Sequence, residues 1–145
     1  MQFFGLLATI TALAASTLAA PSATTSVTVS YDTIYDAAGT SLTQVACSDG
    51  TNGLLTKGYM TFDSLPHFPN IGGAAAVAGW NAAACGSCSQ LAYDGTSIFL
   101  LAVDHTDDGF NVSEEAMDAL TGGQAATLGR IEATPTQVDA SLCML

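Results

Sequence analysis

Four cysteines follow a short uncharged N-terminal segment that predicts export from the cell: Cys47, Cys85, Cys88 and Cys143. Residues 1–19 carry no charge, are dominated by Ala, Leu and Phe, and end in small residues, as a secretory signal peptide does. Exported chains form disulfide bonds because their compartment is oxidising. The sequence therefore predicts a fold closed by two disulfides, and four cysteines allow three pairings.

The same N-terminal segment is a poor candidate for a membrane anchor. A spanning helix needs about 20 consecutive apolar residues, whereas this run is interrupted by hydroxyl residues at positions 9, 11, 16 and 17. We expect cleavage near 19/20, leaving residues 20–145 as a single domain. No second hydrophobic segment follows, so we expect a secreted, extracellular product that associates with cell walls and not with membranes.

The charge balance excludes several classes of partner. The formal net charge is −11, and Lys57 and Arg130 are the only fixed positive charges. Such a surface repels phosphate backbones and anionic lipid, so nucleic-acid binding is not expected. Only 10% of the residues are charged. A weakly charged surface of small residues suits contact with carbohydrate or with an air–water boundary.

The pattern of apolar residues is mostly of period two, which predicts a mainly β protein. We expect strands over residues 26–31, 42–46, 89–93, 97–103 and 126–133, separated by turns rich in Gly and Asp. Ser113 and two acidic residues predict the start of a helix that stops at Gly122-Gly123. The Ala- and Gly-rich stretch 71–80 fits a short helix or a loop. These elements predict a compact barrel with small helices across its outside.

The cysteine spacing offers two rival interpretations, both weak. Cys85 and Cys88 have the two-residue spacing of a zinc knuckle, but Cys47 and Cys143 stand alone and supply no second close pair. A redox role would require a strand leading directly into a helix at this point. His67 and His105 lack metal-ligand spacing, and no nucleophile-elbow motif is present. We therefore expect no metal site, no cofactor and no complete catalytic constellation.

Several short sequence blocks after the N-terminal segment, and the order in which they occur, resemble those of the cerato-platanin family of small secreted fungal proteins. The blocks include residues 29–32, 47–50, 52–54, 71–73, 79–81, 85–88, 101–104 and 109–111. Ser89 departs from the family pattern, which often has an aromatic residue after the cysteine pair.

The resemblance implies a six-stranded double-psi β-barrel stabilised by the disulfides Cys47–Cys85 and Cys88–Cys143, each contributing about 4 kcal/mol in the chain-entropy model. It also implies binding of chitin and N-acetylglucosamine oligomers, and of other wall polysaccharides, with expansin-like loosening of walls and no cleavage. Recognition by a plant receptor as a defence elicitor, and self-assembly at interfaces, are further implications.

Asp104 is the first candidate for a binding residue. It follows an apolar strand, so its carboxylate is expected at the rim of the barrel, and the matching aspartate of the family resembles the acidic residue of expansins. The alternative is a turn aspartate that caps local amides. Asp49 and Asn52, in a glycine-bounded loop, and Tyr31 and Asp32, at the end of the first strand, are the other carbohydrate-binding candidates.

Three further predictions complete the site. The single tryptophan, Trp80, is expected to pack in the interior rather than to form a platform. Asn111-Val112-Ser113 is an acceptor sequence for glycosylation at Asn111. Asp104 also leaves open a weak hydrolase or lytic activity, although the common glycosidase mechanism needs two carboxylates and no partner for Asp104 is obvious.

Overall fold

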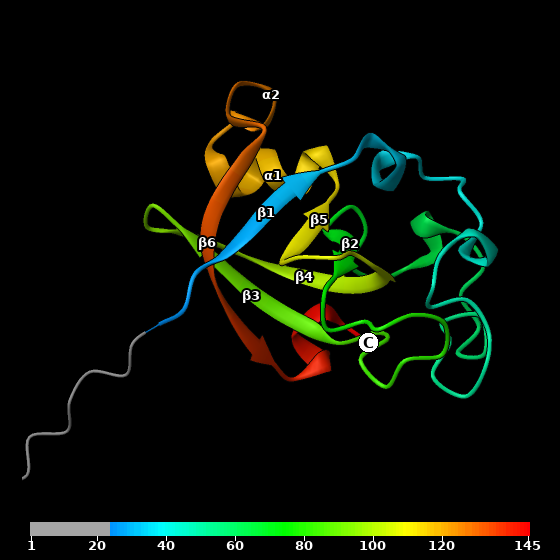
Figure 1. Cartoon of the computed structure of the whole chain (residues 1–145). Helices are drawn as coiled ribbons and strands as arrows, with labels where there is room; N and C mark the ends of the chain where they lie inside the picture. The colour runs from blue at the N-terminus through cyan, green and yellow to red at the C-terminus, as the bar shows by residue number, and fades with distance from the viewer. Residues whose placement is uncertain (1–23) are drawn as a thin grey trace, which may run out of the picture.

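The structure is a computed structural model that describes residues 24–145, coloured in Figure 1. The predicted signal peptide and its cleavage site lie outside the described residues. The described part contains six strands: β1 (Val27–Tyr31), β2 (Ile71–Ala74), β3 (Cys88–Tyr93), β4 (Thr96–His105), β5 (Phe110–Val112) and β6 (Arg130–Val138). Its two α-helices are α1 (Glu114–Thr121) and α2 (Ala125–Leu128). Its four 3-10 helices are η1 (Thr33–Asp36), η2 (Leu42–Gln44), η3 (Phe62–Ser64) and η4 (Ala140–Cys143).

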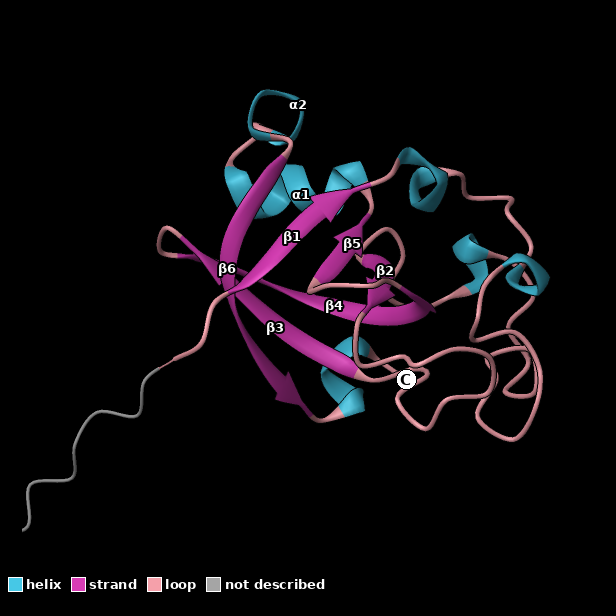
Figure 2. Cartoon of the chain, viewed as in Figure 1, coloured by secondary structure: helices cyan, strands magenta, loops and turns pink. Residues whose placement is uncertain are grey.

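The strands form one closed barrel in the order β1-β5-β2-β4-β3-β6, with β6 pairing back onto β1. Two contacts are parallel, β1 with β5 and β2 with β4, and the other four are antiparallel. Figure 2 shows the strands crossing around a common interior, with α1 and α2 at one end and the long loops gathered on one side. The expectation of a mainly β, six-stranded barrel with small helices is confirmed.

The core is continuous from the barrel interior to the underside of α1. Four successive residues of β4, Leu100 to Val103, are buried because one face of the strand points into the barrel and the other is covered. Helix α1 contributes Ala116, Met117 and Leu120 to the same core. Each fully buried Val, Leu or Met side chain of this core stabilises the fold by roughly 1.5–3 kcal/mol.

Helix α1 begins and ends where the sequence predicts. The Ser113 hydroxyl accepts a hydrogen bond from the Ala116 amide, and Gly122 closes the helix in the left-handed conformation, with φ of 68°. A second cap comes from far away in the sequence. The Asp36 carboxylate accepts hydrogen bonds from the amides of Glu114 and Glu115, at 2.8 and 3.0 Å, so η1 is fixed against α1.

Three sequence-based expectations of secondary structure were wrong. Residues 42–46 form no strand, because the Ser41 hydroxyl caps the 3-10 helix η2 instead. Residues 126–133 divide at Gly129 into the end of α2 and the start of β6. The stretch 71–80, expected as a short helix or a loop, begins with the strand β2 and is a loop only from residue 75 onward. Its Gly72 lies so close to the Asn111 carbonyl that a side chain there would collide with the backbone of β5.

Both disulfides join segments that the barrel alone would leave separate. Cys47 is bonded to Cys85, and Cys88 to Cys143, which are the pairs that the resemblance implies. The first ties the loop after η2 to the segment that follows β2. The second ties the start of β3 to η4, close to the C-terminus.

None of the helices within residues 24–145 has the length and apolar run that are needed to cross a bilayer.

Candidate functional site

Asp104 lies next to last in β4, and three donors hold its carboxylate. Oδ1 accepts hydrogen bonds from the backbone amides of Ala46 and His105, both at 2.8 Å. Oδ2 accepts one from the Tyr35 hydroxyl at 3.1 Å. The side chain is half-buried. One of these amides is the next residue in the chain, while Ala46 and Tyr35 come from distant segments, so Asp104 does more than cap a local turn.

Tyr35 is the buried partner that sequence reasoning missed. Its ring is only 5% exposed, and it packs against Phe62. Burial, followed by the charge of Asp104 and the hydrogen bond to it, raises the pKa of the Tyr35 hydroxyl far above its ordinary value. The hydroxyl therefore stays protonated and remains a donor to Asp104. No sequence motif marks this pair, because 69 residues separate the two side chains.

Tyr31 and Asp32 lead from β1 into the 3-10 helix that carries Tyr35. Asp32 is exposed, and its Oδ1 accepts a hydrogen bond from the Ile34 amide at 3.0 Å, which caps η1. Its charge lies close enough to Tyr35 to contribute to the raised pKa of that hydroxyl. Tyr31 is half-buried and packs against the barrel core. Of the two, Asp32 is the more accessible to a ligand.

Asp49 and Trp80 form a second group on the loop side of the molecule. The indole N–H of Trp80 donates a hydrogen bond to Asp49 Oδ1 at 2.6 Å. The expectation that Trp80 packs in the interior was wrong, because 64% of its surface is exposed. The ring leaves the core because the backbone turns at this point: Gly79 and Asn81, on either side of it, have φ of 156° and 55°.

Asn52 holds the Trp80 turn against the loop that carries Asp49. Its backbone N–H donates to Asn81 Oδ1 at 2.8 Å, and its side-chain Nδ2 donates to the backbone carbonyl of Asn81 at 2.9 Å. Gly50 lies against the same side chain, and a Cβ there would come within 2.6 Å of Asn81 Oδ1. Asn52 is therefore a half-buried connector, and one of its two side-chain N–H donors is already used.

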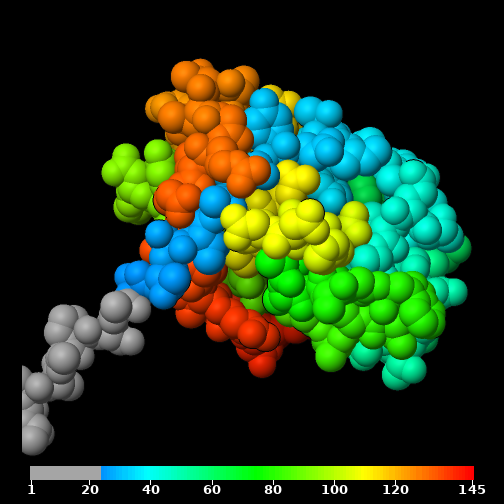
Figure 3. All heavy atoms as spheres, viewed as in Figure 1, coloured from blue at the N-terminus to red at the C-terminus, as the bar shows by residue number. Residues whose placement is uncertain are grey.

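Backbone contacts at the end of β4 hold in place the residues around Asp104 and the group formed by Asp49 and Trp80. The Cys47 amide donates to the Val103 carbonyl, and the Gly86 amide donates to the Ala102 carbonyl. The Cys47–Cys85 disulfide then joins the two loop segments. Figure 3 shows these segments, cyan to green, as one surface over a side of the barrel. The predicted site residues thus share a region, with Asp104 supported by the barrel and Asp49 and Asn52 by the loops.

His105 adds an ionisable contact to this region. Its Nδ1 lies 2.6 Å from the Val77 carbonyl oxygen, and its Nε2 lies 3.2 Å from Asp107 Oδ1. Only the protonated ring donates from both nitrogens. The hydrogen bond to Val77 first, and then the one to Asp107, raises the pKa of His105 above its ordinary 6.5. Its charge thus strengthens a link between β4 and the segment that leads to Trp80.

The predicted glycosylation acceptor lies in β5 and the cap of α1. Asn111 is half-buried, and its Oδ1 accepts a hydrogen bond from the Ser30 hydroxyl at 3.1 Å. Ser113 is fully buried, and its hydroxyl donates to the Pro69 carbonyl at 2.6 Å. In the folded chain both side chains of the acceptor sequence are engaged, and glycosylation at Asn111 stays a prediction.

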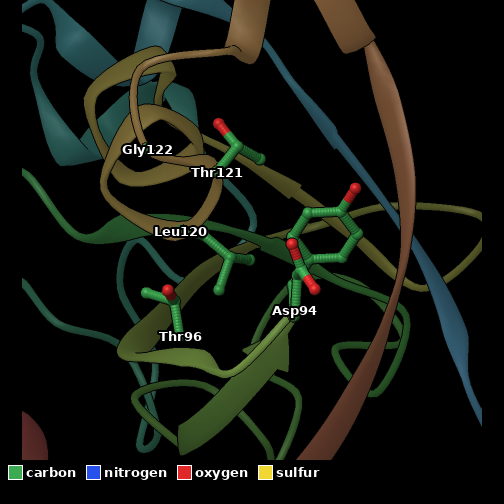
Figure 4. Close-up of a pocket in the computed structure, with 6 residues that line it drawn as sticks. Asp94, Thr96, Leu120, Thr121 and Gly122 are labelled. Atoms are coloured by element: carbon green, nitrogen blue, oxygen red, sulfur yellow. The ribbon is translucent and has the colours of Figure 1, made fainter.

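A small hollow lies elsewhere on the barrel. It is between the β3–β4 turn and the C-terminal end of α1, has a volume of about 100 Å³, and is shown in Figure 4. Tyr93, Asp94, Thr96, Leu120, Thr121 and Gly122 line it. None of the candidate residues named above lies there. Within residues 24–145, no group of three or more His, Cys, Asp or Glu side chains is placed to hold a metal ion.

Comparisons with known proteins give consistent results. Residues 27–145 match the family model described as Cerato-platanin. The chain is 47% identical over 129 residues to the "Heat-stable 19 kDa antigen" of Coccidioides immitis, covering 89% of this chain and 88% of that protein. The crystal structure of cerato-platanin 3 from M. perniciosa superposes with a TM-score of 0.80 at 47% identity, covering 83% of this chain and 100% of that one. The solution structure of the fungal elicitor Cerato-Platanin gives a TM-score of 0.73 at 42% identity, covering 81% and 96%.

Proposed function

Because the chain belongs to the cerato-platanin family, we propose that it is a secreted, non-catalytic protein that binds chitin and N-acetylglucosamine oligomers. It would loosen wall polymers by taking over hydrogen bonds between neighbouring chains, without cleaving a glycosidic bond. Other wall polysaccharides that present the same hydroxyl and amide groups are secondary partners. The product acts outside the cell, in contact with the wall.

The observation that carries the proposal is the fixed carboxylate of Asp104. A carboxylate has about four acceptor positions, and three hydrogen bonds from Ala46, His105 and Tyr35 use most of them. About one acceptor position is left for a ligand. A group held in this way accepts a hydrogen bond from a sugar hydroxyl or an acetamide N–H without paying to order itself first.

Charge supports a neutral ligand. The chain has a net charge of −11 with two Lys and Arg residues in total, and the proposed ligand acceptor Asp104 is a carboxylate. An anionic polymer would be repelled. N-acetylglucosamine oligomers carry no charge, and they offer many donors to carboxylate acceptors.

Asp104→Asn tests the binding role. Asparagine keeps one oxygen to accept the amides of Ala46 and His105, but it removes the charge. Because a hydrogen bond to a charged group contributes about 1.5–3 kcal/mol, we expect Kd for an N-acetylglucosamine tetramer to rise about tenfold or more. Calorimetric titration measures the change. Asp94→Asn, an exposed aspartate on the β3–β4 turn, is the matched control, and equal affinities for the two variants would contradict the proposal.

Recognition by plants is a further part of the proposed function. One related protein of known structure, Cerato-Platanin, is a fungal elicitor. We propose that this chain also acts as a defence elicitor through a plant receptor that contacts its exposed surface. Leaf tissue treated with the purified protein should show a defence response. If the protein causes no response at the dose at which a known elicitor does, this part of the proposal is wrong.

A second candidate function is surface activity. Several large apolar side chains are more than 45% exposed, among them Ile34, Met60, Leu142 and Met144. Such side chains favour an air–water boundary. Surface tension measured against protein concentration tests this function. If the protein self-assembles at the interface, the unchanged protein and Asp104→Asn should lower the surface tension equally.

Hydrolysis is the third candidate, and the geometry gives it little support. Asp104 accepts hydrogen bonds from three protein donors, so its role is that of a fixed acceptor and not of a proton donor to a leaving oxygen. The common mechanism also requires a second carboxylate across the bond. New reducing ends in a digest of chitin oligomers would favour this candidate over the binding proposal.

A further inference from the structure

Trp80 is the only tryptophan of the chain, and the structure presents it to solvent. With 64% of its surface exposed, the ring contributes little to the core. Its N–H is nevertheless fixed at 2.6 Å from Asp49 Oδ1. A side chain that is exposed and yet held by a charge-assisted hydrogen bond offers an apolar ring in a defined orientation.

Hydrogen bonds hold the backbone beside the ring in an uncommon conformation. Asn81 has a φ of 55°, a left-handed conformation that few non-glycine residues adopt, Asn more readily than most. Two hydrogen bonds from Asn52 stabilise this turn, and Gly50 leaves space for the Asn81 side chain.

The surroundings of the ring decide between possible occupants. Insertion into a lipid or air phase would carry the Asp49 carboxylate with the indole, and removing a charge from water is costly. An anionic partner would meet the negative net charge of the chain. A neutral sugar avoids both costs, because its C–H face covers the ring while its hydroxyls remain near the carboxylate and water.

We propose that the indole face of Trp80 is a stacking platform for one pyranose ring of a neutral polysaccharide. Asp49, with one carboxylate oxygen bonded to the indole, accepts a sugar hydroxyl with the other, and the exposed Thr51 borders the same loop. This inference rests on the proposed function, and it adds to that function the residue that supplies the apolar contact. Asp104 contributes polar recognition from the barrel.

The experiment uses the single tryptophan as its own reporter. The ¹⁵N-labelled mature protein is titrated with an N-acetylglucosamine tetramer, and the only indole N–H signal is followed with the intrinsic fluorescence. We expect both to change in a saturable way. Trp80→Ala should raise Kd about tenfold, near the upper end of what one aromatic contact contributes, and Trp80→Phe should recover part of the affinity.

Leu128→Ala is the matched control, because Leu128 is an exposed apolar side chain on α2. It should bind as the unchanged protein does. Folding of each variant is checked by its ¹H–¹⁵N spectrum, and the indole signal of the unchanged protein tests the inference without any variant.

The possible outcomes separate this inference from the proposed function. If the tetramer binds and shifts amides near Asp104, while the indole is unaffected and Trp80→Ala binds normally, the stacking inference is overturned and the proposed function stands. If the unchanged protein does not bind the tetramer, both fall. If Trp80→Ala abolishes only surface activity, the ring is an interface anchor and the inference is wrong.

Discussion

The two disulfides close loops of similar length but hold different parts of the molecule, so their removal separates stability from binding. Cys47–Cys85 spans 38 residues and joins the two loop segments of the site. Cys88–Cys143 spans 55 residues and joins β3 to η4, and neither of these elements carries Asp49 or Trp80. Each is removed by a double substitution to alanine.

The loss of stability follows from the loop lengths. The chain-entropy relation gives about 3.9 kcal/mol for the shorter loop and about 4.2 kcal/mol for the longer one. For a domain of this size, 1 kcal/mol shifts Tm by about 3–5 °C, so both variants should melt about 12–20 °C lower. All four sulfur positions are buried, and the cavity contributions are therefore similar.

The effect on sugar binding should differ. Without Cys47–Cys85, the loop with Asp49 and the turn with Trp80 are still joined by the hydrogen bonds from Asn52 to Asn81 and from Trp80 to Asp49, but the covalent link is lost. We therefore expect Kd for the N-acetylglucosamine tetramer to rise several-fold. Without Cys88–Cys143, Kd should stay within about twofold, because the loop contacts remain.

Thermal unfolding by circular dichroism gives Tm, and calorimetric titration well below either Tm gives Kd. The reasoning would be refuted if the two double variants lost affinity equally at matched folded fractions. It would also fail if removal of Cys88–Cys143 weakened binding more than removal of Cys47–Cys85.

Two further predictions concern pH and a backbone contact. Because the pKa of His105 is raised in the folded chain, its protonated form stabilises the fold below pH 6.5, and this contribution is lost as the pH rises through the folded pKa. Tm should therefore fall as the pH rises above 6.5, and His105→Gln should flatten that slope; an unaltered slope in this variant would contradict the assignment. Gly109→Ala should destabilise the fold by about 2–4 kcal/mol in urea unfolding, because its φ is 48° and a Cβ would collide with the Thr28 carbonyl. Gly95→Ala, with a φ of 79° and open space around it, should lose only about 1–2 kcal/mol, and equal losses would show that the collision is absent.

Local signals were enough to predict the elements whose own sequence contains start and stop signals. Helix α1 has a capping serine, acidic residues in its first turn and a terminal glycine, and all three act as expected. The alternating strands β1, β3 and β4 were also placed, with errors of a few residues at their ends.

Elements that depend on distant partners escaped prediction. β2 consists of Ile71 and three small residues, which have weak strand preference, and it is a strand because β4 and β5 pair with it on both sides. The short β5 follows a turn and is similarly defined by its neighbours β1 and β2.

The site was predictable in its parts but not in its connections. The strand pattern correctly placed Asp104 near the end of β4, but its partner Tyr35 is 69 residues away. Trp80 was expected in the core because large aromatic rings are usually buried. Its exposure follows from the turn at Asn81 and from the Asp49 carboxylate, neither of which has a sequence signal of its own.

The most direct test of sugar binding without cleavage is an NMR titration of the ¹⁵N-labelled mature protein with an N-acetylglucosamine tetramer, with the anomeric signals of the sugar followed in the same tube. The account predicts saturable shifts confined to residues around Asp104, Asp49 and Trp80, and a tetramer that remains intact. No shifts at saturating sugar, or the appearance of shorter oligomers, would contradict it.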